Sequence, residues 1–326
     1  MVGHRTSARA AGILVGYLAD QVFGDPRRGH PVAGFGTTAA TLERVVYRDS
    51  RSAGVLHTTL LVTTVGAAST YAARAARRQG PLYEAAWVAA ATWVSLGGRS
   101  LVHTGAELAA LLEADDIDGA RLLLPSLCGR DPAFLDADGL ARAALESIAE
   151  NTSDAQVAPL MWAAMAGAPG VLVYRAINTL DAMVGHRSPR YGRFGWAAAR
   201  TDDVANYLGA RLGGVLVVLC APVIGGSPRG AWQAWWRDAA RHPSPNAGVV
   251  EAAFAGALGV RLGGPTQYRH ELQIRPALGD GRPPGAADLR RSVRLSQAVQ
   301  LAAALVAAGV AISVAGRSGR RVWSRH

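Results

Sequence analysis

The chain has 326 residues, of which 50% are hydrophobic and 18% are charged, and its formal net charge is +10. This composition is more apolar than that of a typical soluble domain, so part of the apolar surface is expected to face lipid. Every basic residue other than histidine is arginine, which excludes a Walker A loop and a catalytic lysine, and no nucleic-acid-binding motif accompanies the charge, so nucleic acid is not an expected partner.

The first polar segment, residues 20–36, reads DQVFGDPRRGHPVAGFG. Its glycines and prolines predict a loop that contains Asp25, Arg27 and His30. One interpretation is an ordinary turn that ends in an extended residue before Pro31. The other is a backbone that comes close to an anion, with arginine as the partner of a phosphate. The sequence leaves both interpretations open.

Five apolar windows reach or approach the length of about 20 residues that a helix needs to cross a bilayer. They cover residues 53–73, 82–98, 155–174, 212–226 and 298–316. We therefore predict an all-α, polytopic integral membrane protein with about four to six spans, one domain over residues 1–326, in the inner or plasma membrane. The alternative is a soluble helical protein with buried core helices, because alanine makes these windows only weakly apolar.

Between the windows, residues 105–153 have the spacing of amphipathic helices, and the second helix is expected to begin with an aspartate N-cap at 136–138. Its end carries two acids four residues apart, followed by an amide and another acid: Glu146, Glu150, Asn151 and Asp154. Two carboxylates at this spacing repel each other unless a cation or ligand lies between them. A solvated helix face is the alternative interpretation.

Two further groups of acids and amides border apolar windows. Asn178 and Asp181 are three residues apart, and Asp202 and Asn206 are one helical turn apart, with Asp203 between them. Polar groups at membrane depth are costly and usually face a cavity or a partner. Mg²⁺ prefers oxygen ligands and is usually held by one or two carboxylates together with substrate phosphates. The three sets of carboxylates and amides that border two of the apolar windows could build such a site.

Residues 227–248, SPRGAWQAWWRDAARHPSPNAG, predict an aromatic-rich helix followed by a turn-rich loop. The tryptophans suit a helix at the membrane interface, and packing against protein is an equally good alternative. The loop combines an imidazole, a hydroxyl and an amide in His242, Ser244 and Asn246. The glycines of 256–268 and the Pro/Gly segment 275–287 predict further loops.

Four blocks in this order resemble one family. They are a DxxFGDPxxxHPVxxxG pattern at 20–36, ESIAENTSDAQVAPLMW at 146–162, YRAINTLDAMVGHRSPRYGRFGWAAARTDDVANYLGARL at 174–212, and DAARHPSPNAGVVEAAFAGALGVRLGGPTQY at 238–268. From about residue 12 to 268 the chain resembles the CobD/CbiB family of cobalamin-biosynthesis membrane proteins, the adenosylcobinamide-phosphate synthases. The windows at 53–98 and 298–316 match that family only in hydrophobic character.

The resemblance implies that the chain attaches aminopropanol, free or as its O-phosphate, to a propionate carboxylate of adenosylcobyric acid through an amide bond. ATP and Mg²⁺ are expected to activate the carboxylate as an acyl phosphate. The residues implied as catalytic are Glu146, Glu150, Asn151, Asp181 and Asp202. Those implied as ligands of Mg²⁺ are Glu150, Asp154, Asp181, Asp202 and Asp203. Those implied in substrate binding are Asp25, Arg27, His30, Asn178, Arg187, Arg200, Asn206, His242, Ser244 and Asn246. The division of roles among the carboxylates stays open.

Two functions from other classes compete with this one. A transporter or binding protein for corrinoids or other anions is favoured by the interruption Gly-Ala-Pro-Gly at 167–170, because broken helices mark substrate sites in transporters, although no repeat relates two halves of the chain. A phospholipid head-group transferase could use the acids at 202–203. The resemblance also allows association with other cobalamin-pathway enzymes.

Overall fold

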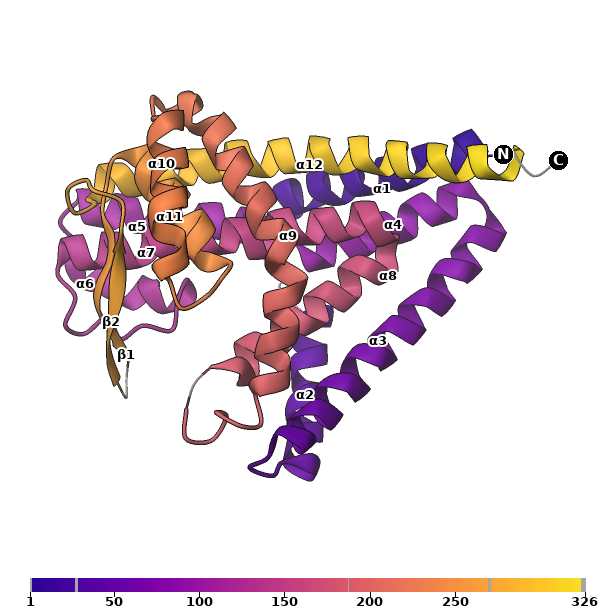
Figure 1. The fold of residues 1–326 in the computed structure, drawn as a ribbon, viewed down its shortest axis with the longest axis horizontal. Helices are drawn as coiled ribbons and strands as arrows, with labels where there is room; N and C mark the ends of the chain where they lie inside the picture. Colours follow the sequence, from indigo (N-terminus) through magenta and orange to yellow (C-terminus); the bar gives the residue numbers. More distant parts are fainter. Residues whose placement is uncertain (1, 27–28, 187, 269–270, 324–326) are drawn as a thin grey trace. The chain divides into compact units, whose positions relative to one another are not determined.

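The computed structural model describes residues 2–26, 29–186, 188–268 and 271–323, with side chains over 8–26, 29–186, 188–265 and 274–313, and it is almost entirely helical (Figure 1). The predicted all-α class is confirmed. The chain divides into two compact units, each assembled from separate stretches of sequence. Unit 1 comprises Met1–Gly97, Ala158–Asn206 and Ala303–His326, and unit 2 comprises Gly98–Val157 and Tyr207–Ala302. The prediction that the whole chain forms one domain stays a prediction.

Unit 1 is a helical assembly. It contains α1 (Val2–Phe23), α2 (Pro31–Val46), α3 (Arg51–Gln79), α4 (Pro81–Ser95), α8 (Ala158–Leu180), the π-helical turn η3 (Asp181–Gly185), the start of α9 (Trp196–Cys220) and the end of α12 (Ala286–Trp323). Helices α1 and α4 approach closely because Gly12 and Gly16, one turn apart, lie against the backbone of α4. A side chain at either glycine would collide with a carbonyl oxygen, so glycine is required for this packing.

Helix α8 is broken at Gly167, where φ is 68° and ψ is −155°. The break and the following Pro169 remove the helical hydrogen bonds that the carbonyl groups of Ala164 and Met165 would otherwise accept. Arg9 of α1 donates to both oxygens, at 3.3 and 3.4 Å. The interruption predicted at 167–170 is therefore present, and a side chain from a neighbouring helix satisfies the backbone that it exposes.

Unit 2 contains a second set of helices and one small sheet. Its elements are α5 (Gly98–Glu113), α6 (Ile117–Leu123), the 3₁₀ turn η1 (Leu124–Ser126), α7 (Ala137–Thr152), the π-helical turn η2 (Ser153–Val157), the end of α9, η4 (Ala221–Ile224), α10 (Pro228–Asp238), η5 (Ala239–Arg241), α11 (Ala247–Leu258), β1 (Leu262–Tyr268), β2 (Glu271–Leu278) and the start of α12. Asp136 caps α7 by accepting from the N–H of Gly139 at 2.8 Å, as the sequence predicted.

The segment 262–278, expected from its glycines and prolines to form loops, is an antiparallel hairpin of β1 and β2. Arg142 of α7 holds β1 in place by donating to the carbonyl oxygens of Gly263 and Pro265. At the other end, the Gly279 N–H donates to Asp238 of α10 at 2.9 Å. The expectation of loops was wrong because these anchors from distant helices order a segment whose local sequence lacks strand periodicity.

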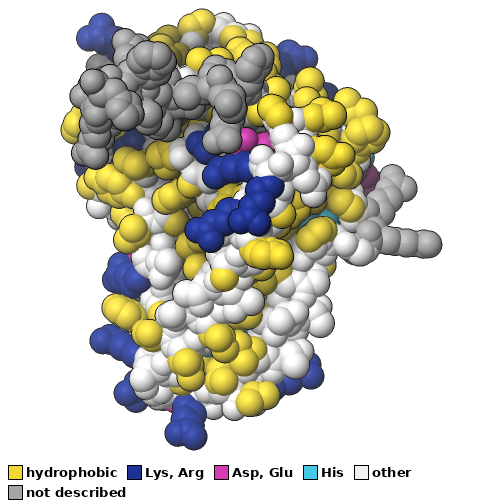
Figure 2. Space-filling model, turned by 90° about the vertical axis from the view of Figure 1, so that its right-hand side faces the viewer, with side chains coloured by type: hydrophobic (Ala, Val, Ile, Leu, Met, Phe, Trp, Pro, Cys, Tyr) yellow, Lys and Arg dark blue, Asp and Glu magenta, His cyan; other side chains and the backbone are white. Residues whose placement is uncertain are grey.

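Three helical stretches among the described residues are long and apolar enough to cross a membrane: Ala137–Gly185, Trp196–Ile224 and Ala286–Ser313. They contain all or most of three predicted windows. The windows at 53–73 and 82–98 form α3 and α4, but α4 has only 15 residues and the threonines of α3 dilute its apolar character. The total of about four to six spans stays a prediction. On the face drawn in Figure 2, hydrophobic side chains are spread widely and carboxylates are scarce.

Candidate functional site

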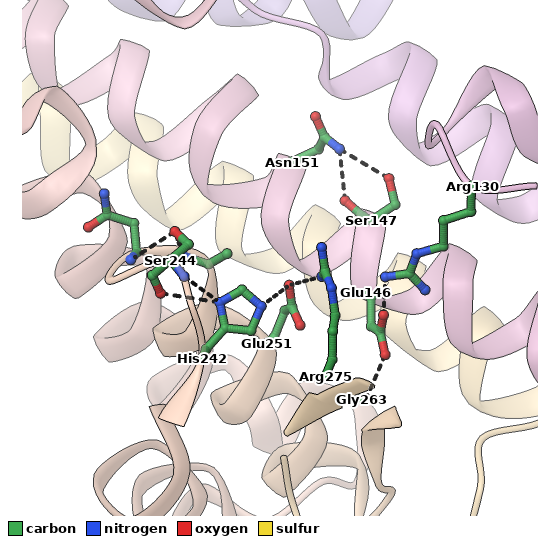
Figure 3. A network of polar contacts seen from close by, with 11 residues as sticks. Arg130, Glu146, Ser147, Asn151, His242, Ser244, Glu251, Gly263 and Arg275 are labelled. Carbon is green, nitrogen blue, oxygen red and sulfur yellow. Dashed lines mark hydrogen bonds and ion pairs between the residues drawn. The ribbon is translucent and has the colours of Figure 1, made fainter. Parts of the chain in front are cut away.

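Unit 2 gathers ionisable side chains from five segments of the chain around α7 and α11 (Figure 3). Helix α7 contributes Glu146 and Glu150, and α11 contributes Glu251. The segment before α7 contributes Arg130, strand β2 contributes Arg275, and the loop before α11 contributes His242. Glu251 interacts electrostatically with both other carboxylates and with both guanidinium groups. The cluster therefore combines three carboxylates with two permanent positive charges.

Glu146 is buried, and each of its two carboxylate oxygens has a partner. One carboxylate oxygen forms an ion pair with Arg130, which is itself buried, and the other accepts the backbone N–H of Gly263 at 2.7 Å. Such a pair fixes geometry more than it adds stability, because both charges have lost water. The catalytic role of Glu146 stays a prediction. Its hydrogen bond with Gly263 connects α7 to strand β1 of the hairpin.

Glu251 is the acid that differs most from Glu146. It is 1% exposed and stands alone among apolar residues on α11. Its Oε1 lies 3.8 Å from His242 Nε2 and 3.9 Å from Arg275 Nη1, too far for a hydrogen bond in either case. Burial and the neighbouring Glu146 and Glu150 carboxylates raise the pKa of Glu251 well above its ordinary value. Glu251 is therefore poised to hold a proton at a pH where an ordinary glutamate is ionised.

The loop that carries His242 is held by its own polar residues. His242 Nδ1 lies 3.1 Å from the Ser244 N–H and 3.2 Å from the Ser244 carbonyl oxygen, so Nε2 is the nitrogen that faces Glu251. Burial and the positive charge of Arg275 lower the pKa of His242, which keeps the imidazole neutral near pH 7. Ser244 Oγ accepts the N–H groups of Asn246 and Ala247 and thereby caps α11. The amide oxygen of Asn246 accepts from Arg211 at 2.7 Å.

The remaining predicted residues of unit 2 lie on the same helix as Glu146 or just after it. The Glu150 side chain is not covered by the protein and is within electrostatic range of Arg275 and Arg130. Asn151 donates its amide nitrogen to the Ser147 carbonyl and hydroxyl oxygens, at 2.9 and 3.2 Å. Asp154 lies in the turn η2. Glu150 is thus the carboxylate of this cluster that the protein itself leaves uncovered.

Unit 1 holds a second, different polar group between α8 and α9. The Tyr174 hydroxyl donates to Asn206 at 2.7 Å, and Asn206 donates to Asp202 at 2.8 Å. Asn178 donates to the other oxygen of Asp202 at 3.4 Å and accepts from Arg175 at 3.2 Å. The structure therefore joins Asn178, Asp202 and Asn206, as the sequence predicted, in a network made mainly of neutral partners.

Other predicted residues of unit 1 lie apart from this network or have local tasks. His30 caps α2 by accepting the Val32 N–H at 3.1 Å, and it lies 3.8 Å from Asp25, which favours the interpretation as a structural turn. Arg200 pairs with Asp203 at 3.1 Å. Asp181 opens η3, and its carboxylate occupies the space beside Gly185 that a side chain would need. Arg27 and Arg187 lie outside the described residues.

The predicted metal ligands fall into both units, Glu150 and Asp154 in unit 2 and the others in unit 1. Within the residues that the structure describes, no three or more His, Cys, Asp or Glu side chains come close enough together to hold a metal ion. This arrangement differs from a protein-only metal cage. It remains compatible with Mg²⁺ that is held mainly by the phosphates of a substrate.

Sequence reasoning missed three members of the unit 2 cluster: Arg130, Glu251 and Arg275. A signal existed for Glu251, because a lone acid in an otherwise apolar helix marks a functional position more often than a surface one. Arg130 and Arg275 carried no comparable signal, since arginine is the common charged residue throughout this chain.

Comparisons with known proteins agree with the sequence resemblance. The family described as CobD/Cbib protein matches residues 13–296. The chain belongs to the CobD/Cbib family. It is 67% identical over 299 residues to the cobalamin biosynthesis protein CobD of Mycobacterium tuberculosis strain CDC 1551, covering 92% of this chain and 95% of that one. The CobD of Geobacter metallireducens is 42% identical, covering 91% and 95%, and that of Chromobacterium violaceum is 41% identical, covering 86% and 90%. No solved structure matches.

Proposed function

We propose that this CobD/Cbib-family chain joins aminopropanol or its O-phosphate to a propionate carboxylate of adenosylcobyric acid, forming an amide bond in cobalamin biosynthesis. Family membership supports the pathway. The observation that supports the chemistry is the cluster in unit 2, where three carboxylates face two guanidinium groups and a neutral imidazole. With Glu251 protonated the charges of the cluster balance, and with Glu251 ionised one carboxylate is in excess, so the form that can act as a base also attracts a positive charge such as an ammonium group.

Amide formation needs two kinds of help. The carboxylate must be activated, and the ammonium must lose a proton before its nitrogen can attack. We assign the proton to Glu251, because a buried carboxylate with a raised pKa is a suitable general base near neutral pH. The nitrogen forms the new bond to the acyl carbon, the activating phosphate leaves, and the second proton of the nitrogen departs with it.

ATP with Mg²⁺ is the proposed source of activation, and the residues of unit 2 fit it. Mg²⁺ commonly takes one or two protein carboxylates and otherwise phosphate oxygens, and Glu150, which the protein leaves uncovered, can supply such a ligand. Bound Mg²⁺ would neutralise phosphate charge. Asp154, Asp181, Asp202 and Asp203 stay predicted ligands. A multi-pass position in the cell membrane, with ATP reached from the cytoplasm, completes the proposal.

The transporter alternative depended on the interruption of the apolar window at 167–170. In the structure, Arg9 donates to the carbonyl groups that this break exposes. A helix break whose backbone is already satisfied within the protein does not require a substrate at that point. This observation favours the enzyme over the transporter.

Mass spectrometry tests the proposal. The purified protein in lipid nanodiscs would be incubated with adenosylcobyric acid, aminopropanol phosphate and Mg-ATP. We expect a product whose mass equals the two substrates less one water, formed with one ADP for each amide. A corrin that binds tightly but leaves unchanged would overturn the enzyme and favour the transporter or binding protein. A parallel reaction with free aminopropanol in place of aminopropanol phosphate shows which amine gives the faster formation of the amide.

A further inference from the structure

Helix α10 begins where a candidate membrane span ends. The apolar stretch Trp196–Ile224 is followed by three residues and then by Pro228, the first residue of α10, with Ser227 as its N-cap. Over so short a connection, the start of α10 cannot be far from the end of the span. The helix therefore starts at the level where α9 and η4 leave the hydrocarbon.

One face of α10 packs against protein and another does not. Ala231, Ala234 and Asp238 are buried, and the backbones of Gly230 and Gly256 touch where α10 meets α11. Trp232 and Trp236, by contrast, are 44% and 68% exposed. Two exposed indole rings one turn apart form a large apolar surface on a helix that is otherwise well packed.

The exposed rings are continuous with the span. Trp235 contacts Trp232 and Trp236, with ring centroids 5.4 and 6.4 Å apart, and its ring lies against Gly214 of α9. Within unit 2, α9 and η4 expose Val215, Leu219 and Val223 at intervals of four residues. This spacing puts an apolar stripe on one face of the span, as expected for contact with lipid.

We propose that α10 lies in the headgroup layer of the membrane, with Trp232 and Trp236 inserted at the boundary between water and hydrocarbon. Tryptophan prefers this boundary because its ring is apolar and its N–H is polar. The exposed Arg229 at the start of the helix suits the phosphates of the surrounding lipids, and so does the exposed Arg241 just after it, which also pairs with Asp238 at 3.3 Å. Of the two interpretations that the sequence allowed for this helix, the exposure of the rings favours the interface.

This position fixes the depth of the polar cluster in unit 2. Helix α11, which carries Glu251, packs directly on α10. Strand β2, which carries Arg275, belongs to a two-stranded sheet with open edges, and open edges do not occur in lipid. Both observations put the cluster at the water side of the interface, where a phosphorylated, water-soluble amine can reach it. The access of the amine to the cluster depends on the proposed function, whereas the insertion of α10 into the membrane does not.

Quenching of tryptophan fluorescence by brominated lipids tests the insertion. The protein and its Trp232→Phe/Trp236→Phe variant would be reconstituted in nanodiscs whose phosphatidylcholine carries bromine either near the headgroup or near the chain end. The difference between the two proteins isolates the emission of these two tryptophans. We expect bromine near the headgroup to quench this difference signal strongly and bromine near the chain end to quench it weakly.

Phenylalanine keeps an apolar ring, so the double variant is expected to fold. Trp162→Phe is the control for the loss of a tryptophan elsewhere in the protein, because Trp162 belongs to unit 1 and donates to the Ala205 carbonyl oxygen there. A difference signal that no bromolipid quenches and that aqueous acrylamide quenches fully would place α10 in water and overturn the proposal. Stronger quenching from the chain ends would place it inside the hydrocarbon and overturn it equally. None of these outcomes depends on enzymatic activity, so failure here is separate from failure of the proposed reaction.

Discussion

Both units bury polar side chains between apolar helices, but they do so in opposite ways. In unit 1, Asp202 receives hydrogen bonds from Asn178 and Asn206, whose donors are neutral amides. In unit 2, Glu251 has charged or titratable neighbours at 3.8 and 3.9 Å, beyond hydrogen-bond distance. The first arrangement stabilises one conformation. The second leaves a carboxylate whose protonation can change, which is the property that proton transfer requires.

The largest expected effect comes from Glu251→Gln. The amide side chain keeps the shape of glutamate but cannot accept a proton, so amide formation should slow about 10²- to 10⁴-fold. Steady-state rates by mass spectrometry measure the change. The matched control is Glu113→Gln, an exposed acid paired with Arg290 on the surface of unit 2, which should leave the rate unaltered. A fully active Glu251→Gln would remove the assigned base.

Loss of Arg130 should affect stability most. Arg130→Met leaves Glu146 buried without its ion-pair partner, and breaking a buried pair in this way costs about 3–5 kcal/mol. Thermal unfolding in detergent measures the loss. The double variant Arg130→Met/Glu146→Gln removes both charges and should recover part of the loss, because the amide oxygen of glutamine can still accept the Gly263 N–H. If the single and double variants are equally unstable, the loss of stability does not come from the unpaired Glu146 charge, and the prediction is wrong.

Asp202→Asn sharpens the comparison between the units. The new amide group points a donor at a donor, so one of the two hydrogen bonds is lost and stability should fall by about 1–3 kcal/mol. If Asp202 serves mainly to hold α8 and α9 together, the rate of amide formation in the folded variant should fall less than in Glu251→Gln. A rate as low as that of Glu251→Gln, with unfolding unchanged, would instead support the predicted role of Asp202 as a metal ligand.

The smallest effect is a pH dependence of stability. Because the pKa of Glu251 is raised by burial, the folded protein binds a proton there that the unfolded chain releases above its ordinary pKa of 4.5. Glu251 therefore favours folding below about pH 4.5 and loses this contribution as the pH rises through the folded pKa. Relative to the wild type, Glu251→Gln should become progressively more stable from pH 5 to 8. Melting temperatures of the two proteins across this range measure the change in stability. A difference in melting temperature that stays constant with pH would contradict the raised pKa of Glu251.

The sequence foretold the helical class, the start of α7 at Asp136 and the pairing of Asp202 with Asn206, because each depends on residues within a few turns of one another. It failed where distant segments meet. Nothing near residue 275 indicates that its guanidinium approaches α11, and the hairpin around it is ordered by Arg142 and Asp238 from other elements. Glu251 was within reach of sequence reasoning, since it is the sole charge on α11, but its isolation gave no motif to notice.

The assignment of proton transfer to unit 2 is tested most directly by trapping the activated carboxylate. Hydroxylamine attacks acyl phosphates as a neutral nucleophile and needs no base to lose a proton first. Glu251→Gln would be incubated with adenosylcobyric acid, Mg-ATP and hydroxylamine, and the corrin analysed by mass spectrometry. We predict that the variant forms the hydroxamate at nearly the wild-type rate while it fails to form the amide with aminopropanol phosphate. Loss of both products together would show that Glu251 is needed for activation, and the assignment of the base would be wrong.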